Sequence, residues 1–152
     1  STIVIMAREY RLISAQYYIE GDDEPHEIPG VPGYYKPEGV GKYLSAFPSH
    51  AASKAYSALI KYMRRYRNRG PGGNLFSDVD FAKPPVMVVL IEDIATGKSK
   101  AYKVMREVAP QSQNGPRVIV NRSGSRVGAR REYRWRNVVS MIKLADVAQV
   151  AE

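Results

Sequence analysis

The chain contains no cysteine, only two histidines and no long apolar run. Without cysteine it cannot use thiolate catalysis, cysteine zinc sites or disulfide bonds. No stretch approaches the roughly 20 apolar residues that a membrane-spanning helix needs. The first residues also lack the charged-then-apolar order of a signal peptide. We therefore expect a soluble protein of a reducing compartment, or of a particle that is assembled there.

Catalytic motifs are also absent. His26 and His50 have no carboxylate pair or serine elbow beside them in a recognisable spacing. Residues 96–98, Thr-Gly-Lys, lack the upstream glycine of a phosphate-binding loop, and the acidic residues of 22–27 do not match a calcium loop. The sequence therefore predicts a protein that is not an enzyme and that has no metal and no cofactor.

Acidic residues are missing from the two segments that carry most of the positive charge. Residues 48–70 hold six basic and no acidic side chains, and residues 117–143 hold eight basic side chains and one acidic one, in a chain of net charge +8. Two such segments on one surface would attract a polyanion and release its counterions. The alternative is that both are ordinary solvated surfaces that keep the protein soluble.

The pattern of apolar and turn residues predicts a single α+β domain over residues 1–152, a size sufficient for one hydrophobic core. Residues 20–41 contain four prolines and five glycines and are expected to form an acidic loop or arm, ahead of a helix-plus-sheet core at 41–143. Strands are expected at 2–6, 42–47, 86–94, 99–108, 118–120 and 130–142, with a hairpin turn at 95–98.

The clearest element is a helix that begins at Pro48 and ends before Gly70. At 100° per residue one stripe is apolar and should enter the core. Lys54, Lys61 and Arg65 fall on the opposite side, where we expect them to face a ligand. Cations in the last turns also suit the negative end of the helix dipole, which gives Arg64, Arg67 and Arg69 a structural explanation. The apolar stripe consists of Ala52, Ala55, Leu59, Met63 and Tyr66.

The segment RREYRWRNVVSMIK, residues 130–143, combines four arginines with a tyrosine and the only tryptophan. As a strand, its second half is apolar on both faces and is expected to be buried on both. Tyr133 and Trp135 should pack onto the sheet, with stacking on a base as the alternative. The preceding loop, RSGSRVGARR, alternates arginine with small residues, which suits contact with a nucleic-acid backbone and almost equally an acidic protein.

Two longer segments resemble a known family. They are GKYLSAFPSHAASKAYSALIKYMRR, residues 41–65, and VVLIEDIATGKSKAYKVMRE, residues 88–107. Together they resemble a small basic protein type of large nucleocytoplasmic DNA viruses, which is distantly similar to the methanogen non-histone chromosomal protein. That protein is a monomer that bends DNA. The resemblance implies a helix on a small curled antiparallel sheet, a pseudo-barrel.

The resemblance also implies roles for individual residues. It places Lys42, Lys54, Lys98, Lys103 and Arg106 among the basic elements of a DNA binder. Met105 stands where the archaeal family has an aromatic residue. This difference weakens the expectation that the residue inserts between base pairs, although methionine can also act as such an apolar wedge.

Two functions follow as expectations. The first is a non-enzymatic, architectural packaging protein of a virion that binds double-stranded DNA without strong sequence preference. The second is a minor capsid protein that bridges neighbouring coat proteins, with its basic face toward them or the genome. Both place the protein in the virion, after synthesis in the host cytoplasm or nucleus, and neither involves a membrane span or a small-molecule substrate. The residues expected to bind nucleic acid or an acidic partner are Lys42, Lys54, Lys61, Arg65, Lys98, Lys103, Arg106, Arg122, Arg126, Arg130, Arg131, Arg134 and Arg136, and the candidates for stacking or wedging are Tyr133, Trp135 and Met105.

Overall fold

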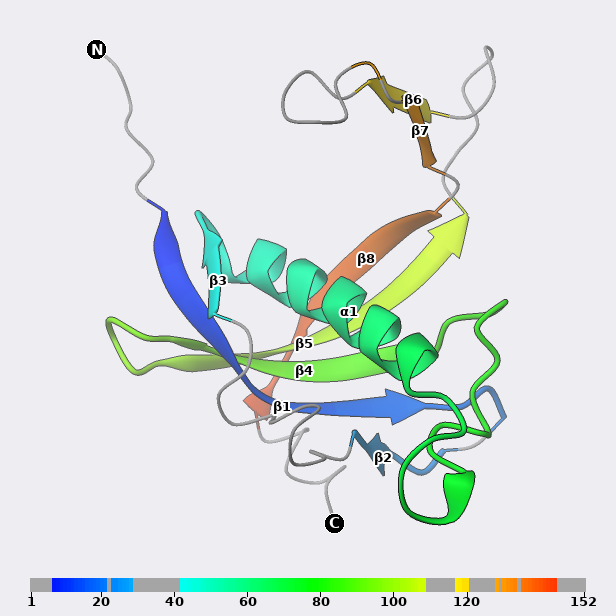
Figure 1. The fold of residues 1–152 in the computed structure, drawn as a ribbon. Coiled ribbons are helices and arrows are strands. Elements are labelled where there is room, and N and C mark those ends of the chain that lie inside the picture. Colours follow the sequence, from blue (N-terminus) through cyan, green and yellow to red (C-terminus); the bar gives the residue numbers. More distant parts are fainter. Residues whose placement is uncertain are drawn as a thin grey trace, which may run out of the picture.

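The computed structural model describes residues 7–21, 23–28, 42–108, 117–120, 128, 130–133 and 135–144. The strand predicted at 2–6 and most of the loop predicted at 20–41 lie outside these residues. The described residues form an α+β fold with one α-helix and an antiparallel sheet of six strands (Figure 1).

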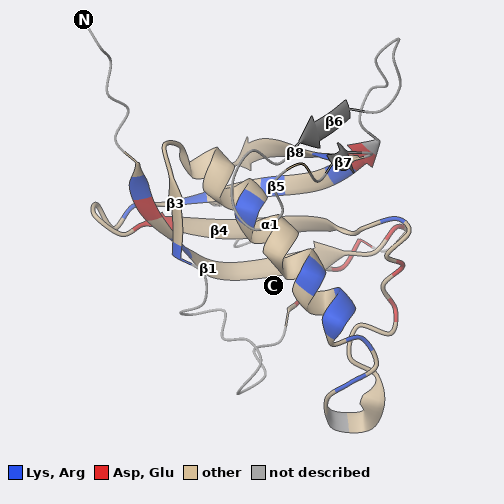
Figure 2. Ribbon diagram, turned by 45° about the horizontal axis from the view of Figure 1, so that its top comes forward, with Lys and Arg blue, Asp and Glu red and all other residues tan. Residues whose placement is uncertain are grey.

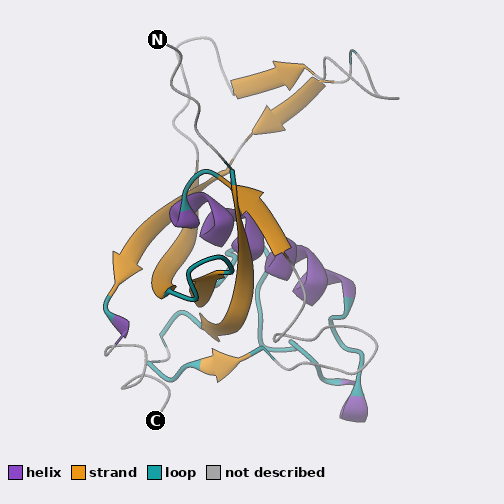
Figure 3. Ribbon diagram, turned by 90° about the vertical axis from the view of Figure 1, so that its left-hand side faces the viewer, coloured by secondary structure: helices purple, strands orange, loops and turns teal. Residues whose placement is uncertain are grey.

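The six-stranded sheet curls around the helix but does not close (Figure 3). This confirms the predicted fold class, with an open sheet in place of a complete barrel. Along the main path the order is β2-β1-β4-β5-β8. Strand β3 also pairs with β1, on the same edge of β1 as β2. The strands are β1 (Arg8–Tyr18), β2 (His26–Glu27), β3 (Lys42–Ser45), β4 (Val86–Asp93), β5 (Ser99–Val108) and β8 (Trp135–Ile142).

The hairpin of β4 and β5 is confirmed, and its turn is held by local hydrogen bonds. β4 reads VMVVLIED, a run rich in β-branched residues that suits a buried strand. The N–H of Gly97 donates to the carbonyl of Asp93 at 2.8 Å, and the N–H of Ala95 donates to the Asp93 side chain at 3.0 Å. Gly97 has φ of 72°, a conformation that glycine adopts without a steric penalty.

Helix α1 (Pro48–Arg65) begins at the predicted proline and lies in the concave side of the sheet (Figures 1 and 3). It packs against β1, β3, β4, β5 and β8. The predicted apolar stripe is confirmed over its first four members, which are all buried, whereas Tyr66 is half-buried. The helix ends before the predicted glycine, and Asn68 and Gly70 both have positive φ in the turn that follows.

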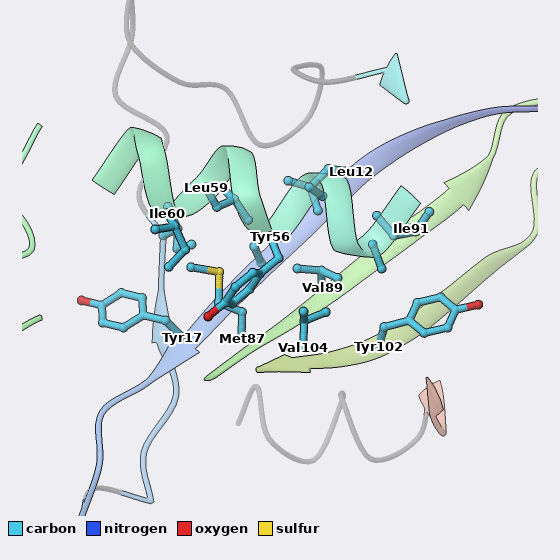
Figure 4. Close-up of a cluster of buried hydrophobic side chains, with 14 of the residues drawn as sticks. Leu12, Tyr17, Tyr56, Leu59, Ile60, Met87, Val89, Ile91, Tyr102 and Val104 are labelled. Atoms are coloured by element: carbon cyan, nitrogen blue, oxygen red, sulfur yellow. The ribbon is translucent and has the colours of Figure 1, made fainter. Parts of the chain in front are cut away.

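The core lies between α1 and the helix-facing side of the sheet (Figure 4). Tyr56 of α1 is completely buried there, and its hydroxyl donates to the carbonyl of Pro85 at 2.9 Å. Burial raises the pKa of Tyr56 to about 12, although the positive charge of Arg106 acts in the opposite direction. Around it, Leu12, Met87, Val89, Ile91 and Val104 bring β1, β4 and β5 into one cluster.

Strand β1 lies ahead of the core expected at 41–143 and covers most of residues 10–19, which in the sequence are only a mixed stretch of apolar and polar residues. It pairs with β2, β3 and β4 and so lies inside the sheet. Its register shifts between Leu12 and Ser14, and the buried positions change from Tyr10 and Leu12 to Ala15 and Tyr17. This bulge moves the buried set from even to odd positions, so the sequence shows no continuous two-residue period.

The strand predicted at 130–142 is two strands, β7 (Arg130–Tyr133) and β8. β7 pairs with β6 (Arg117–Val120) in a separate two-stranded sheet (Figure 1). The prediction that the second half is buried on both faces is wrong, because Met141 is 68% exposed. Trp135, expected to pack onto the sheet, keeps 42% of its surface exposed. β8 lies at the edge of the sheet, where fewer neighbours cover its side chains.

Candidate nucleic-acid interface

The predicted basic row of α1 faces solvent. Lys54, Lys61 and Arg65 are exposed, and at helical spacing they lie opposite the buried stripe. Figure 2 shows in blue where lysines and arginines fall along the ribbon of α1 and the turn after it. The Lys54 ammonium group donates to the carbonyl of Leu44 at 2.7 Å and so ties β3 to the helix. In the described part of the chain, neither Lys61 nor Arg65 forms an ion pair with a carboxylate. Their charges therefore remain available to an anionic partner.

The row ends in an arginine cluster that spans the last turn of α1 and the turn after it, and we define this cluster as Arg64, Arg65, Arg67 and Arg69. All four side chains are exposed. The backbone of the turn that carries Arg67 and Arg69 is held in place, because the N–H of Leu75 donates to the carbonyl of Arg69 at 3.2 Å. The cluster therefore extends the basic face of α1 on an ordered turn.

Aromatic rings lie under the arginine cluster. The guanidinium carbons of Arg64 and Arg67 lie 5.7 and 5.6 Å from the ring centre of Phe81. That of Arg65 lies 5.5 Å from the ring centre of Tyr66. Contacts between a cation and an aromatic face hold a guanidinium without neutralising it. The arginines are thus oriented while keeping their charge.

A second layer of rings supports the first. The ring centre of Tyr62 lies 5.1 Å from that of Tyr66 and 5.8 Å from that of Phe76. Burial, and then the neighbouring Tyr66, raise the pKa of Tyr62. Tyrosine is uncharged at neutral pH, so these rings add no negative charge beside the cations.

Arg136, a predicted cation of the sheet, does not join this face. Arg136 of β8 forms an ion pair with Glu107, which lies directly opposite it on β5. The adjacent pair, Arg106 and Asn137, points toward α1, so Arg136 and Glu107 point to the other side of the sheet. The expectation that Arg136 and the helix row form one continuous field is therefore not met. Lys42 and Lys103 are exposed on β3 and β5, and Lys98 is exposed at the β4–β5 turn.

Arg106, expected on the binding surface, is half-buried between the helix and the sheet. Its guanidinium donates to Asn137 Oδ1 at 3.1 Å and to Ser57 Oγ at 3.2 Å. It also lies 5.4 Å from the ring centre of Tyr56. Asn137 Nδ2 in turn contacts Ser53 Oγ and Ser57 Oγ, both at 3.0 Å. Through these contacts Arg106 holds α1 against β5 and β8.

The other predicted residues lie partly outside the described chain. Met105 is half-buried on β5, directly opposite Val138, and does not project as a wedge would. For Arg130, Arg131 and Tyr133 the structure describes the backbone of β7 only, and Arg122, Arg126 and Arg134 lie outside the described residues.

Sequence reasoning missed the full extent of the arginine cluster. Arg64, Arg67 and Arg69 were explained by the helix dipole, and the sequence predicted no partner for them. The signal that was present is the alternation of arginine with tyrosine and asparagine in residues 64–69, together with the complete absence of acidic residues from 48–70. The ring of Phe81 lies 17 residues after Arg64 and 14 residues after Arg67 in the sequence, so it could be assigned to them only from the structure.

The described residues contain no group of three or more histidine, aspartate or glutamate side chains placed to hold a metal ion. Among them there is also no helix with the length and apolar character needed to cross a membrane. Comparisons with protein-family models, with curated proteins and with solved structures found no match.

Proposed function

We propose that the protein binds double-stranded DNA through its phosphates, without enzymatic activity, as an architectural packaging protein. The observation that carries this proposal is the exposed face of α1 and the turn after it. That face presents Lys61 and the arginine cluster with no ion-paired carboxylate in the described part of the chain. Such a face gains affinity by releasing counterions from the nucleic acid.

The dimensions of the face suit a duplex backbone. From Lys54 to Arg65 the helix rises about 16 Å at 1.5 Å per residue. That length matches about five base-pair steps of 3.4 Å. The exposed side of α1 presents lysine and arginine, which bind phosphates as cations. Contacts of this kind fix a protein on the duplex without reading its sequence.

The resemblance of residues 41–65 and 88–107 to basic proteins of large DNA viruses supports a packaging role in a virion. Packaging requires many contacts that tolerate any sequence, and phosphate contacts by lysine and arginine provide them. The proposed partner is therefore duplex DNA of arbitrary sequence.

A salt series on random duplex DNA tests the proposal. In the variant Lys61→Ala/Arg65→Ala/Arg67→Ala, three phosphate contacts are removed. Each contact contributes about 0.9 to the slope of log affinity against log salt concentration, so we expect the slope to fall by roughly 2 to 3. Fluorescence anisotropy with labelled DNA, between about 50 and 300 mM salt, measures it.

The matched control removes the same charge elsewhere, with Lys83→Ala/Lys100→Ala/Lys143→Ala. Lys83 is already paired with Glu20 at 3.6 Å, and Lys100 and Lys143 lie on β5 and directly after β8. We expect the salt slope of this control to differ from the parent slope by no more than about 0.9, the contribution of one phosphate contact. Equal losses of slope in both variants would mean that net charge, and not the face of α1, determines binding. A flat salt response in the parent would reject DNA as the partner.

A minor capsid role is the second candidate, and one observation favours it. Leu44 is 60% exposed and Phe47 is 50% exposed, and both lie just before α1. Exposed apolar side chains of this size suit contact with another protein. If the protein bridges coat proteins, shells emptied of their genome should retain it, and Leu44→Ser/Phe47→Ser should release it.

A further inference from the structure

Strand β8 forms one edge of the six-stranded sheet. One side of it pairs with β5 over eight residues, and no strand in the described part of the chain pairs with its other side. Proteins usually protect such an edge with proline, with a bulge or with inward-pointing charges. β8 has no proline and a single charged side chain, Arg136, which is already paired with Glu107. Within the described part of the chain, the edge is therefore open to another strand.

Two large apolar side chains mark the ends of this edge. Trp135 is 42% exposed and Met141 is 68% exposed. They are six residues apart, so both point to the same face of the strand. Each would be covered by a neighbouring strand that places an apolar side chain directly opposite it.

A second copy of β8 provides such a strand. When a strand pairs antiparallel with its own copy, a two-fold axis passes through one residue, and directly opposite residues share a face. With the axis at Val138, Trp135 of each copy lies opposite Met141 of the other. Arg136 then lies opposite Ser140, and no like charges face each other. Only this register brings the two exposed apolar side chains together at both ends.

We propose that the protein forms a two-fold dimer in which the β8 strands pair antiparallel about Val138. The two six-stranded sheets then become one continuous sheet. Because the axis is normal to the sheet, both α1 helices lie on the same side of it, and their basic faces point in the same direction. A contact along eight residues is small, so the dimer forms in a concentration-dependent manner. The proposal does not depend on DNA binding.

A single introduced cysteine tests the register, because the chain has no cysteine of its own. In Val138→Cys the two Cα atoms would lie about 4.5 to 5.5 Å apart, within the range that a disulfide spans. In the control Ser140→Cys, on the same strand, they would lie about 14 Å apart, too far for a disulfide. We expect Val138→Cys to form a covalent dimer in a glutathione redox buffer at about 0.5 M salt, without nucleic acid. Absence of the covalent dimer, or equal crosslinking of both variants, would overturn the proposed pairing.

Sedimentation equilibrium of the cysteine-free protein provides an independent measurement. Ser140→Arg places like charges opposite each other twice in the dimer, at a cost of roughly 0.2 to 1 kcal/mol per pair. The dissociation constant should therefore rise roughly two- to thirtyfold. Ser140→Glu, which faces Arg136 of the second copy, should not raise it, and circular dichroism of both variants checks that they fold. A parent protein that remains monomeric at about 0.2 mM would reject the dimer, and its DNA salt slope would still test the proposed function separately.

Discussion

Replacing Arg106 with methionine distinguishes a structural role of this cation from a DNA-binding role. Methionine keeps an unbranched apolar side chain of similar reach but removes the guanidinium and its hydrogen bonds to Asn137 and Ser57. It also removes the contact with the ring of Tyr56. If these contacts hold α1 on the sheet, the substitution lowers stability and leaves DNA affinity unchanged.

The contacts set the size of the expected effect. A hydrogen bond from a charged donor contributes about 1.5 to 3 kcal/mol, and a cation over an aromatic ring about 0.5 to 1 kcal/mol. The two hydrogen bonds and the ring contact would sum to about 3.5 to 7 kcal/mol. Because Arg106 is only half-buried, water replaces part of each interaction, and the expected loss falls below this range. We expect a loss of about 2 to 3 kcal/mol in the free energy of unfolding. For a domain of this size, that corresponds to a fall in Tm of roughly 4 to 12 °C.

Urea unfolding followed by circular dichroism measures this loss of stability. The DNA salt series on the same variant measures whether Arg106 contacts a phosphate. A phosphate contact by Arg106 would lower the salt slope by about 0.9, whereas a structural role leaves it unchanged. A double-mutant cycle with Asn137→Ala should give a coupling free energy of roughly 0.5 to 3 kcal/mol. The structural role is refuted if the unfolding free energy of Arg106→Met stays within about 0.5 kcal/mol of the parent while its salt slope falls.

Two further predictions concern stability. Tyr56→Phe leaves the buried carbonyl of Pro85 without its hydrogen bond. We expect the free energy of unfolding, measured by urea titration, to fall by about 1 to 3 kcal/mol. An unchanged midpoint would show that the bond contributes nothing. Burial by itself would raise the pKa of Asp93, but hydrogen bonds from Arg8 and from the backbone of the β4–β5 turn lower it overall. Because the pKa of Asp93 is lower in the folded protein, its carboxylate stabilises the fold fully at pH values above the unfolded pKa of about 3.9. This stabilisation is lost as the pH falls through the pKa of the folded state. Asp93→Asn should therefore weaken the dependence of stability on pH in that acid range, and an unaltered acid unfolding curve would count against the assigned pKa.

The elements that a single local period defines were predicted correctly. The stripe of α1 repeats at helical spacing without interruption, and its opposite row of Lys54, Lys61 and Arg65 is exposed as expected. The β4–β5 hairpin was equally clear, because an apolar run ends in a turn that contains glycine. In both elements the burial of each residue depends mainly on its own position in the repeat.

Strand β1 and the final strand were predicted less well for two different reasons. The bulge between Leu12 and Ser14 changes which face is buried, so β1 shows no continuous period. In residues 130–142 the period is regular, but it cannot tell whether a strand lies inside a sheet or at its edge. Met141 is exposed because β8 has only one neighbouring strand in the described chain.

The sequence by itself determined an α+β chain with no cysteine chemistry, one amphipathic helix, and positive charge concentrated in two segments. These properties depend on composition and on contacts between near neighbours in the chain. Only the tertiary structure decided which cations can act together. It turned Arg106 inward to Ser57 and Asn137, paired Arg136 with Glu107 on the side of the sheet away from α1, and placed Arg64 and Arg67 over Phe81. The reason is that the environment of a charge depends on the strands and rings that pairing brings beside it, and these come from residues far apart in the sequence.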